Sequence, residues 1–484
     1  MVQKILALLL AVTMMLGLVN VSVAEEMPNV VIAFMSSTIP TDLELVQNTL
    51  NEILAEKIGV TVTLRYFTFA DFTSKMNLIL ASKSEQMDII PLLSADWTPY
   101  VSTGKLLDIT QEYEEYGTGI QEYLDDEYLA VGQLGDTLYG VPAIYCWAQN
   151  AALLVRTDIL EMAGLEEIPE KMDIYELTEV FEKINAAGNT MPIVGVEQDN
   201  SILGRVEPYD GLTDEFGVLM DYGRSLTVEN WFETEEYYNL LKLMREWNEK
   251  GFIAPDSEIT TDTAATLVKN GVCAGWIGIG DPGSLPTQQV LTGHDLSVIQ
   301  LTTPTASTSG VGLTHWCLPV TCQDKVSAMK VLNEMYSNPE VLSIMDFGVP
   351  GVHYDLVADG VMRMPEGMTA DNSGYYPHVD WYVGNQFIGY VWEELGLDYI
   401  TNLAEYVESA QASLALGFTF DSTEYSAEIA ALINARDQYR AALECGVVDP
   451  DEVLPQMQQA LKDAGIDDII AAKQVQLDAW LATK

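Results

Sequence analysis

The sequence predicts an α/β fold that is divided between two lobes, and three observations support this prediction. The chain has 484 residues, which is too long for one ordinary hydrophobic core. Short apolar runs alternate with segments of helical periodicity, a pattern typical of mostly parallel sheets that helices cover on both faces. Two stretches have the character of crossings between lobes. In 137–156 a turn and two aromatic residues precede a buried-strand pattern, and 302–310 is the clearest linker of the chain.

The first lobe is expected to begin with an apolar run, 29–34, that predicts a strand buried on both faces. Thr41 and Glu44 then have the spacing of a capping box, apolar residues recur on one helical face, and Gly59 is placed to end the helix. A second strand is expected at 60–64, where apolar and polar residues alternate. Further along this lobe we expect a helix over 74–81 and a strand over 87–90 that Pro91 closes.

The second lobe follows the stretch 137–156. Its expected helices lie over 158–165, 173–187 and 234–250, and its expected strands over 272–277 and 297–301. Small residues around Trp276 predict that this side chain stands out from its strand. After 302–310, a strand over 313–320 and a helix over 325–336 are expected back in the first lobe, and a long helical tail over 426–484. The expected domains are a signal peptide at 1–24, a first lobe of 25–147 and 306–345, and a second lobe of 148–305 and 346–484 that includes a C-terminal module.

The charge of the chain excludes some partners. Lysine and arginine number 23 against 72 aspartate and glutamate residues, which gives a formal net charge of −49. So acidic a protein is repelled by nucleic acid and by an anionic membrane surface, and we expect neither as a partner. An anionic ligand is disfavoured as well, unless one local basic pocket holds it.

The first residues have the pattern of an export signal. Lys4 supplies a positive start, 5–18 an apolar segment, and Ser22-Val-Ala24 a cleavage site before Glu25. No later stretch approaches the roughly 18 unbroken apolar residues of a membrane span. We therefore expect a secreted or cell-surface protein, extracellular or periplasmic. No cysteine lies near the cleavage site, so the sequence does not indicate how the protein is held at the surface.

The cysteines and histidines do not indicate a disulfide framework or a metal site. The five cysteines are scattered; Cys317 and Cys322 could pair locally, and buried free thiols are the alternative. The four histidines show neither an HExxH motif nor a paired spacing, and there is no CxxC. We expect no metal, no cofactor and no catalytic residue.

Several segments resemble the extracellular solute-binding proteins of ABC importers, of the type that delivers sugars. In the first lobe the similarity rests on 50–58 and 72–88, and at the border on Tyr139-Gly-Val-Pro142 and Arg156-Thr-Asp-Ile-Leu160. The tail resembles a C-terminal module of a subgroup found mostly in Gram-positive bacteria. Its marks are 347–354, 381–387, 446–450 and 461–465.

This resemblance implies a periplasmic-binding-protein-like fold, in which hinge crossings join two lobes that close on a ligand. It further implies the substrate-binding component of an ABC transporter, which captures a mono- or oligosaccharide in the cleft between the lobes and delivers it to the membrane subunits of a permease. Such a protein is not an enzyme, and we expect it to be a monomer.

A sugar site needs flat aromatic side chains for the apolar C–H faces of the ligand and polar groups for its hydroxyls. These residue types gather in loops after first-lobe strands, at the two crossings and in the aromatic loops of the tail. The predicted ligand-binding residues are Ser36, Ser37, Asp71, Asp96, Trp97, Tyr145, Trp147, Trp276, His315, Trp316, Tyr375, Trp381 and Asn385.

Other functions stay open at this point. A short peptide or an amino-acid derivative would need a charged anchor for its termini, and Arg205, Arg224 or Arg363 could supply one. A secreted glycoside hydrolase would need two carboxylates about 5 to 9.5 Å apart, but with so many acidic residues pairs occur by chance. A surface adhesin that never meets a transporter is a third reading.

Overall fold

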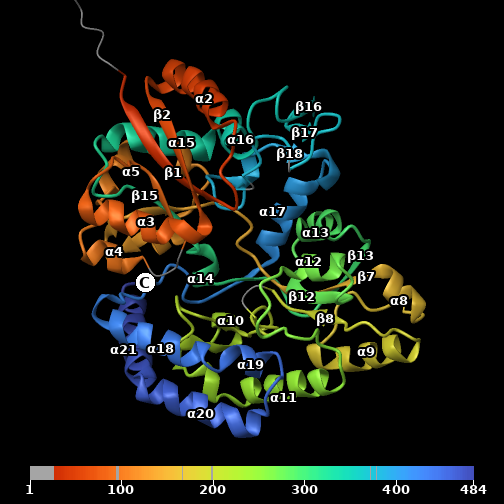
Figure 1. Ribbon diagram of the computed structural model, residues 1–484. Helices are drawn as coiled ribbons and strands as arrows, with labels where there is room; N and C mark the ends of the chain where they lie inside the picture. The colour runs from red at the N-terminus through yellow and green to blue at the C-terminus, as the bar shows by residue number, and fades with distance from the viewer. Residues whose placement is uncertain (1–26, 94–96, 166, 198–199, 371, 378) are drawn as a thin grey trace, which may run out of the picture.

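The computed structural model describes residues 27–93, 97–165, 167–197, 200–370, 372–377 and 379–484. Its buried apolar side chains form two large cores, one in each lobe. Figure 1 shows the two lobes one above the other, with helices packed around the strands of each. The predicted two-lobed α/β fold is thereby confirmed. The predicted signal peptide, 1–24, lies outside the described residues.

The first lobe is built on β1 and β2, which pair in parallel from Asn29↔Thr61 to Ser36↔Thr68. Beside them, β15 lies between β3 and β6 and is antiparallel to both. The carboxyl ends of β1 and β2 are directed toward the second lobe (Figure 1). The main elements of this lobe are β1 (Asn29–Ser36), α2 (Leu43–Ile58), β2 (Thr61–Thr68), α3 (Phe69–Ser82), β3 (Ile90–Leu93), α4 (Thr98–Ser102), α5 (Thr110–Tyr116), α6 (Thr118–Gln121), α7 (Asp126–Leu129), β4 (Gln133–Leu134), β5 (Thr137–Leu138), β6 (Gly140–Pro142), β15 (Thr314–Cys317), α15 (Lys325–Ser337) and α16 (Pro339–Phe347).

The second lobe has a four-stranded sheet of order β13-β7-β12-β8. Its main elements are β7 (Ala151–Arg156), α8 (Thr157–Met162), α9 (Leu177–Ala186), β8 (Val194–Gly195), β9 (Tyr209–Asp210), β10 (Val218–Leu219), α10 (Met220–Gly223), β11 (Val228–Glu229), α11 (Glu235–Glu249), α12 (Ala264–Lys269), β12 (Gly275–Ile279), α13 (Ser284–Thr292) and β13 (Leu296–Gln300). The expected helices over 173–187 and 234–250 correspond to α9 and α11.

The sheets mix parallel and antiparallel pairs, whereas the sequence predicted mostly parallel ones. In the second lobe β7 is antiparallel to both β12 and β13, and only β12 and β8 run in parallel. The crossings explain this difference. Strand β7 begins where the chain enters the lobe at Ala151, and β13 ends at Gln300, where the chain leaves it. Neighbouring strands that leave and return to the same border must run in opposite directions.

Three segments that connect the lobes lie side by side. Gln149 pairs with Thr305, and Thr305 pairs with Gln411. The short strands β14 (Thr305–Ala306) and β19 (Gln411–Ala412) run in parallel there. Helix α14 (Thr308–Val311) follows β14 in the sequence, and helix α17 (Tyr399–Ser409) precedes β19. The sequence predicted the first two crossings near these positions. The third crossing, near 411, carries the chain to the second lobe for the last time.

Part of the tail packs on the first lobe, although the sequence placed all of 346–484 with the second. Tyr375, Val379, Tyr382 and Val383 belong to the first-lobe core. The Tyr382 hydroxyl accepts a hydrogen bond from the Met35 amide (2.8 Å) and donates one to the Met35 carbonyl (2.7 Å). Nearby, a small sheet is formed by β16 (Asp355–Ala358), β17 (Val361–Arg363) and β18 (Val391–Trp392).

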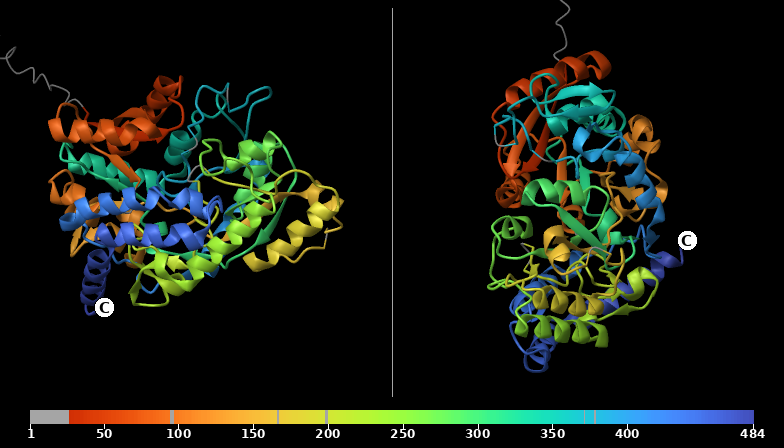
Figure 2. Two further views of the ribbon diagram at one scale, coloured as in Figure 1. Left: turned by 60° about the horizontal axis from the view of Figure 1, so that its bottom comes forward. Right: turned by 90° about the vertical axis from the view of Figure 1, so that its right-hand side faces the viewer.

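The predicted helical tail over 426–484 consists of four helices: α18 (Ser426–Asp437), α19 (Arg440–Glu444), α20 (Pro450–Asp463) and α21 (Ile466–Leu481). We refer to α18–α21 as the C-terminal helices. Both views in Figure 2 show them, in blue, against the yellow-green helices of the second lobe. Leu432, Met457 and Leu477 are fully buried in the second-lobe core, so these helices complete that lobe.

Two further features concern the whole described chain. All five cysteines are free, so Cys317 and Cys322 are not bonded to each other. Within the described ranges, no helix combines the length and the apolar character that crossing a membrane requires.

Candidate functional site

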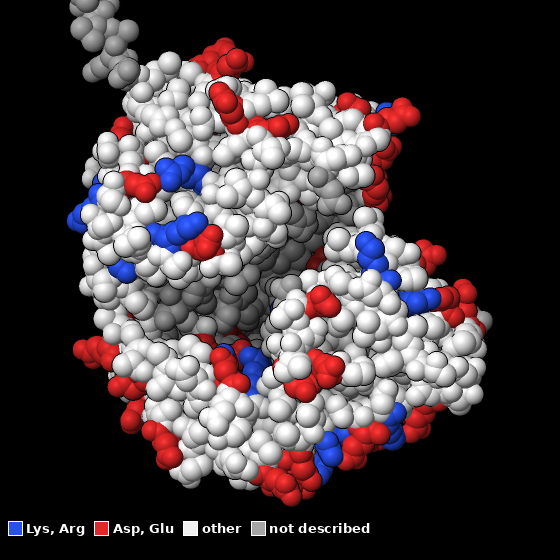
Figure 3. Space-filling view, viewed as in Figure 1, with Lys and Arg blue, Asp and Glu red and all other residues white. Residues whose placement is uncertain are grey.

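A cleft separates the two lobes, and Figure 3 shows it as a deep hollow with charged side chains of both signs on its lower wall. A cavity of about 220 Å³ lies there. Three segments line it, 147–150 from the first crossing, 204–222 from the second lobe and 302–310 from the second crossing, together with Ile279. The candidate site is therefore built mainly from the hinge and from an irregular loop of the second lobe.

The residues of the cavity wall combine aromatic and polar groups. Trp147, Tyr209 and Tyr222 present rings, and hydroxyls, amides and carboxylates stand among them. The charged members are Arg205, Glu207, Asp214 and Glu215. Such a mixture suits an uncharged ligand that has both apolar faces and many hydroxyl groups.

The two glutamates of the wall share one arginine from the C-terminal helices. The Arg440 guanidinium lies 3.5 Å from Glu215 and 4.0 Å from Glu207. Burial raises the pKa of Glu207 well above its ordinary value, and the nearby Glu215 raises it further, while Arg440 opposes both effects. The Tyr209 hydroxyl donates to Glu207 at 2.6 Å. The wall is thus a hydrogen-bonded network, and Arg440 of the C-terminal helices partly compensates the charge of its glutamates.

The aromatic residues of the first crossing hold the hinge together. The Trp147 ring stacks on Tyr128, with centroids 4.3 Å apart, and its Nε1–H donates to the Ala143 carbonyl at 2.9 Å. The Tyr145 hydroxyl donates to the Gly310 carbonyl of the second crossing. Trp147 also lines the cavity, and among the predicted residues that the structure describes it is the one that does so.

Two predicted residues lie beside a smaller space at the border. Trp97 and His315 line a narrow cavity with Phe418 and Thr419 of the second lobe. The two predicted rings are 5.6 Å apart, and the His315 Nε2 lies 3.1 Å from the Val131 carbonyl. Burial lowers the pKa of His315 to about 4, so this imidazole is neutral at pH 7.

Four predicted residues are buried inside the lobes. Trp276 belongs to a small core of the second lobe and is 1% exposed; the adjacent Gly278 makes room for its indole rather than letting it stand out. In the first lobe, the Trp316 indole donates to the Tyr382 carbonyl at 2.8 Å. Tyr375 and Asn385 likewise bond to backbone carbonyls of this lobe, at 2.7 and 3.3 Å.

The remaining predicted residues lie at the carboxyl ends of β1 and β2. Ser36 is buried and donates to the Thr38 carbonyl at 2.7 Å, whereas Ser37 is exposed. Asp71 is exposed and forms an ion pair with Lys75 at 3.0 Å. The half-buried Trp381 stacks on Phe69, the first residue of α3, with centroids 6.4 Å apart. The predicted residue Asp96 lies outside the described residues.

Sequence reasoning missed most of the cavity wall. The loop 204–222 has no helical or strand periodicity, and Arg205 was singled out there only as a possible peptide anchor. The signal that marks this loop is its composition, since glycine, aspartate and tyrosine gather in an irregular stretch between two clear helices. Polar loops of this kind carry binding residues in many folds.

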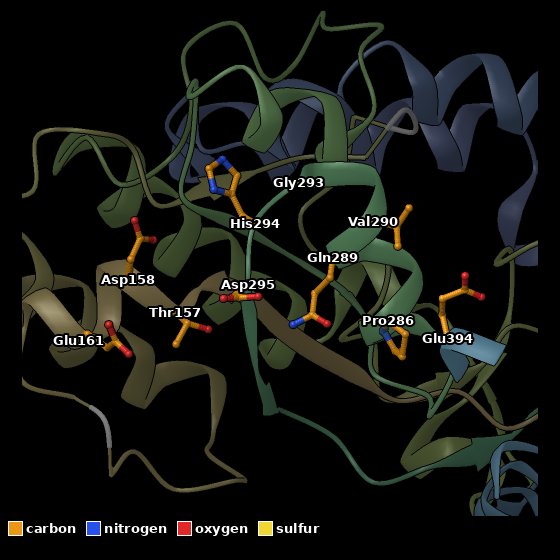
Figure 4. A pocket seen from close by; sticks show the side chains of 10 residues that line it. All are labelled: Thr157, Asp158, Glu161, Pro286, Gln289, Val290, Gly293, His294, Asp295 and Glu394. Carbon is orange, nitrogen blue, oxygen red and sulfur yellow. The ribbon is translucent and has the colours of Figure 1, made fainter. Parts of the chain in front are cut away.

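A second depression, of about 600 Å³, is lined mainly by residues of α8 and α13 and by the segment 293–295, with Glu394 at one side (Figure 4). It is open, and its acidic side chains come from separate elements, such as Asp158 of α8 and Glu394 after β18. Asp158 is already paired with Arg156 at 2.6 Å. In the described part of the chain no group of three potential metal ligands comes together. Of the two, we prefer the cavity of about 220 Å³ as the site, because residues of both crossings line it.

Comparisons with known proteins agree with this architecture. Residues 43–341 match the model of the bacterial extracellular solute-binding protein family, and residues 414–482 match a domain of unknown function (DUF3502). A carbohydrate ABC transporter substrate-binding protein of Streptococcus pneumoniae is 24% identical over 458 residues, which cover 92% of this chain and 89% of that protein. Lipoprotein LipO of Bacillus subtilis is 25% identical over 214 residues, which cover 42% of this chain and 41% of that protein.

Among solved structures, the N-glycan transport solute-binding protein NgtS of S. pneumoniae superposes with a TM-score of 0.82 at 22% identity, covering 94% of this chain and 99% of that one. The S. pneumoniae substrate-binding protein FusA, solved with kestose, gives a TM-score of 0.64 at 16% identity, covering 94% and 100% of the two chains. The fold is therefore that of two-lobed solute-binding proteins. With more than half of its length matched by the family model, this chain belongs to the bacterial extracellular solute-binding protein family.

Proposed function

We propose that the protein is the substrate-binding component of an ABC importer, which captures a neutral oligosaccharide between its lobes and delivers it to a membrane permease. Relatives support this proposal: the full-length relative in S. pneumoniae carries the name of a carbohydrate substrate-binding protein, and NgtS has been solved with Man1GlcNAc and with Man5GlcNAc. Export to the cell surface and a monomeric state complete the proposal.

One observation carries it, namely the composition of the cleft wall. Trp147, Tyr209 and Tyr222 offer ring faces for sugar C–H groups, and carboxylates and amides of the same wall offer hydrogen bonds for hydroxyls. From the first lobe we propose that Ser37, Asp71 and Trp381 meet the ligand. Ser37 and Asp71 follow β1 and β2, whose carboxyl ends are directed toward the second lobe, and Trp381 stacks on Phe69 at the same end. The buried Trp276, Trp316, Tyr375 and Asn385 then support the two cores.

Closure follows from the arrangement of the crossings. The three segments paired at Gln149, Thr305 and Gln411 form a narrow hinge about which the lobes can turn. Ligand bound to one lobe gains contacts with the other as the cleft closes, and those contacts offset the cost of closing. We propose that the permease recognises this closed form.

A short peptide is the second candidate, because Arg205 is exposed and lines the cavity. The test is a thermal-shift screen of residues 25–484 with maltotriose, mannotriose and triacetylchitotriose, and with dipeptides as the comparison. A ligand at a hundred times its dissociation constant adds about 2.7 kcal/mol to the free energy of unfolding. A rise with sugars alone supports the proposal; a rise with dipeptides alone moves the function to the second candidate.

The same sugars test for catalysis. Incubation of labelled trisaccharide with the protein should return the sugar intact. Release of mono- or disaccharide in proportion to protein would show a glycoside hydrolase instead of a binding protein.

A further inference from the structure

Two buried polar atoms of the cleft wall have no hydrogen-bond partner within the described part of the chain. They are the Asp214 Oδ2 and the Asn150 Nδ2. Both residues line the cavity, and both are almost fully buried, with Asn150 at 4% exposure and the Asp214 side chain at 9%. A buried polar atom without a partner is costly. One of these atoms is an acceptor and the other a donor, which is the pair that sugar hydroxyls satisfy.

The other polar atom of each side chain is fixed by the protein. The Asp214 Oδ1 accepts from the Phe216 amide at 2.9 Å and from the Lys473 ammonium. The Asn150 Oδ1 accepts from the Tyr406 hydroxyl at 2.5 Å. Each side chain is therefore held by one atom, while the other atom is buried without a partner among the described residues. Side chains that are oriented in advance for a ligand are expected to have one atom bonded by the protein and one atom without a protein partner.

The loop that carries Asp214 is strained. Leu212, Thr213 and Glu215 have φ values of 45°, 98° and 70°, in the left-handed region that side chains with a Cβ disfavour. Thr213, whose side chain is branched at Cβ, is an outlier there. Strain of this kind persists only where the surroundings impose it, and it gathers at functional sites.

The C-terminal helices impose this conformation. Lys473 of α21 is fully buried, and besides Asp214 it bonds the Gly217 carbonyl at 3.0 Å. Arg436 of α18 and Arg440 of α19 lie 3.1 and 3.5 Å from Glu215 on the same loop. Three cations from these helices thus bond Asp214, Glu215 and Gly217 of the loop 211–217.

We propose that Asp214 and Asn150 form a two-point subsite for hydroxyl groups of a neutral sugar, with Lys473 of the C-terminal helices as the positioning residue that orients Asp214. The inference rests on the proposed function and gives the domain of unknown function at 414–482 a role in ligand recognition. Among the described residues that line the cavity Arg205 is the one cation, and Lys473, Arg436 and Arg440 behind the wall are already paired with Asp214 and Glu215. We therefore expect neutral sugars to bind more tightly than sugar acids.

The first test measures affinities by titration calorimetry, with the best-binding trisaccharide of the neutral set and with trigalacturonate. Asn150→Asp keeps the acceptor for Tyr406 and removes the donor, and Asp214→Asn removes the carboxylate acceptor. Each variant should bind the neutral sugar about tenfold to hundredfold more weakly, and the unaltered chain should bind trigalacturonate more weakly than the neutral sugar. Unchanged affinity in both variants, or preferential binding of trigalacturonate, would overturn the subsite while leaving a sugar-binding protein.

The second test addresses Lys473, and its first readout needs no ligand. Lys473→Met should speed amide hydrogen exchange in 211–217, Lys473→Arg should restore part of the protection, and sugar affinity should follow the same order. Lys462→Met is the matched control. Lys462 also belongs to the C-terminal helices, but its ion pair, with Glu233, is exposed. Equal exchange in Lys473→Met and Lys462→Met would remove the positioning role. Failure of every sugar to bind the unaltered chain would instead refute the proposed function.

Discussion

At the scale of single residues, substitutions of Trp147 and Trp276 should distinguish a residue that contacts the ligand from one that only packs in a core. Trp147 lines the cavity, whereas Trp276 lies in a core of the second lobe. We expect Trp147→Phe to weaken sugar binding about two- to tenfold, which corresponds to the energy of one aromatic contact, and also to lower the melting temperature, because the indole bonds the Ala143 carbonyl and stacks on Tyr128. Trp276→Phe should lower the melting temperature through a cavity while the affinity stays the same. Calorimetry of both variants checks this, and an affinity loss confined to Trp276→Phe would contradict it.

A second residue-scale prediction concerns Asp346, which is 2% exposed and has one carboxylate oxygen without a partner among the described residues. Burial, and then Asp380, raise its pKa well above the ordinary value. The folded state therefore holds a proton that the unfolded state has released, so this group lowers stability as pH rises above the unfolded pKa of about 4.

Asp346→Asn should consequently raise the melting temperature at pH 8, and its advantage over the unaltered chain should shrink toward pH 4. Thermal unfolding at both pH values measures this. Asp359→Asn, in an exposed turn, serves as the control and should change little. An Asp346→Asn variant that is less stable at pH 8 would show that the carboxylate is needed in its charged form.

The sequence could name aromatic residues near strand ends, but it could not tell which way they face. Trp147, Trp276 and Trp316 all lie in or next to apolar runs, and only the tertiary contacts distinguish them. Asp214 and Asn150 could not be singled out at all, because their significance depends on unpartnered atoms that only a folded wall creates.

At the scale of elements, Gly446 shows where two helices approach too closely for a side chain. It has φ +65° after α19, and a Cβ there would lie 2.1 Å from the Met244 carbonyl oxygen of α11. Gly446→Ala should cost at least about 3 kcal/mol of the free energy of unfolding, because backbone must move. Gly360→Ala has a similar φ of +69° with open space around it, and should cost only about 1 to 2 kcal/mol. Denaturant unfolding compares them, and equal costs would contradict the contact argument.

Periodicity predicted the long helices well and the boundaries less well. Helix α15 runs Lys325–Ser337, close to the expected 325–336. The capping box at Thr41 was wrong: α2 starts at Leu43, with no side-chain cap, because the Thr41 and Asp42 amides bond to the Gly374 carbonyl. Strand β3 continues through Pro91 to Leu93, since the neighbouring β15 accommodates the proline. Both misses come from partners that are distant in sequence.

At the scale of the whole molecule, the two lobes were predictable from length, alternating elements and linker composition. The position of Tyr375, Val379, Tyr382 and Val383 in the first-lobe core was not predictable, because nothing local in an aromatic loop says which of the two cores it joins. The C-terminal helices had visible periodicity in the sequence. The role of the buried Lys473 could not be predicted, because it depends on the contact with Asp214, which is distant in sequence.

The central claim is that the protein captures a neutral sugar in the cleft between its lobes. Titration calorimetry of residues 25–484 and of the Asp214→Asn variant, with the same neutral trisaccharide, tests it most directly. We predict saturable binding of one sugar per chain, weakened at least about tenfold in the variant. Absence of sugar binding would contradict the central claim, whereas equal affinity in both proteins would remove Asp214 from the site.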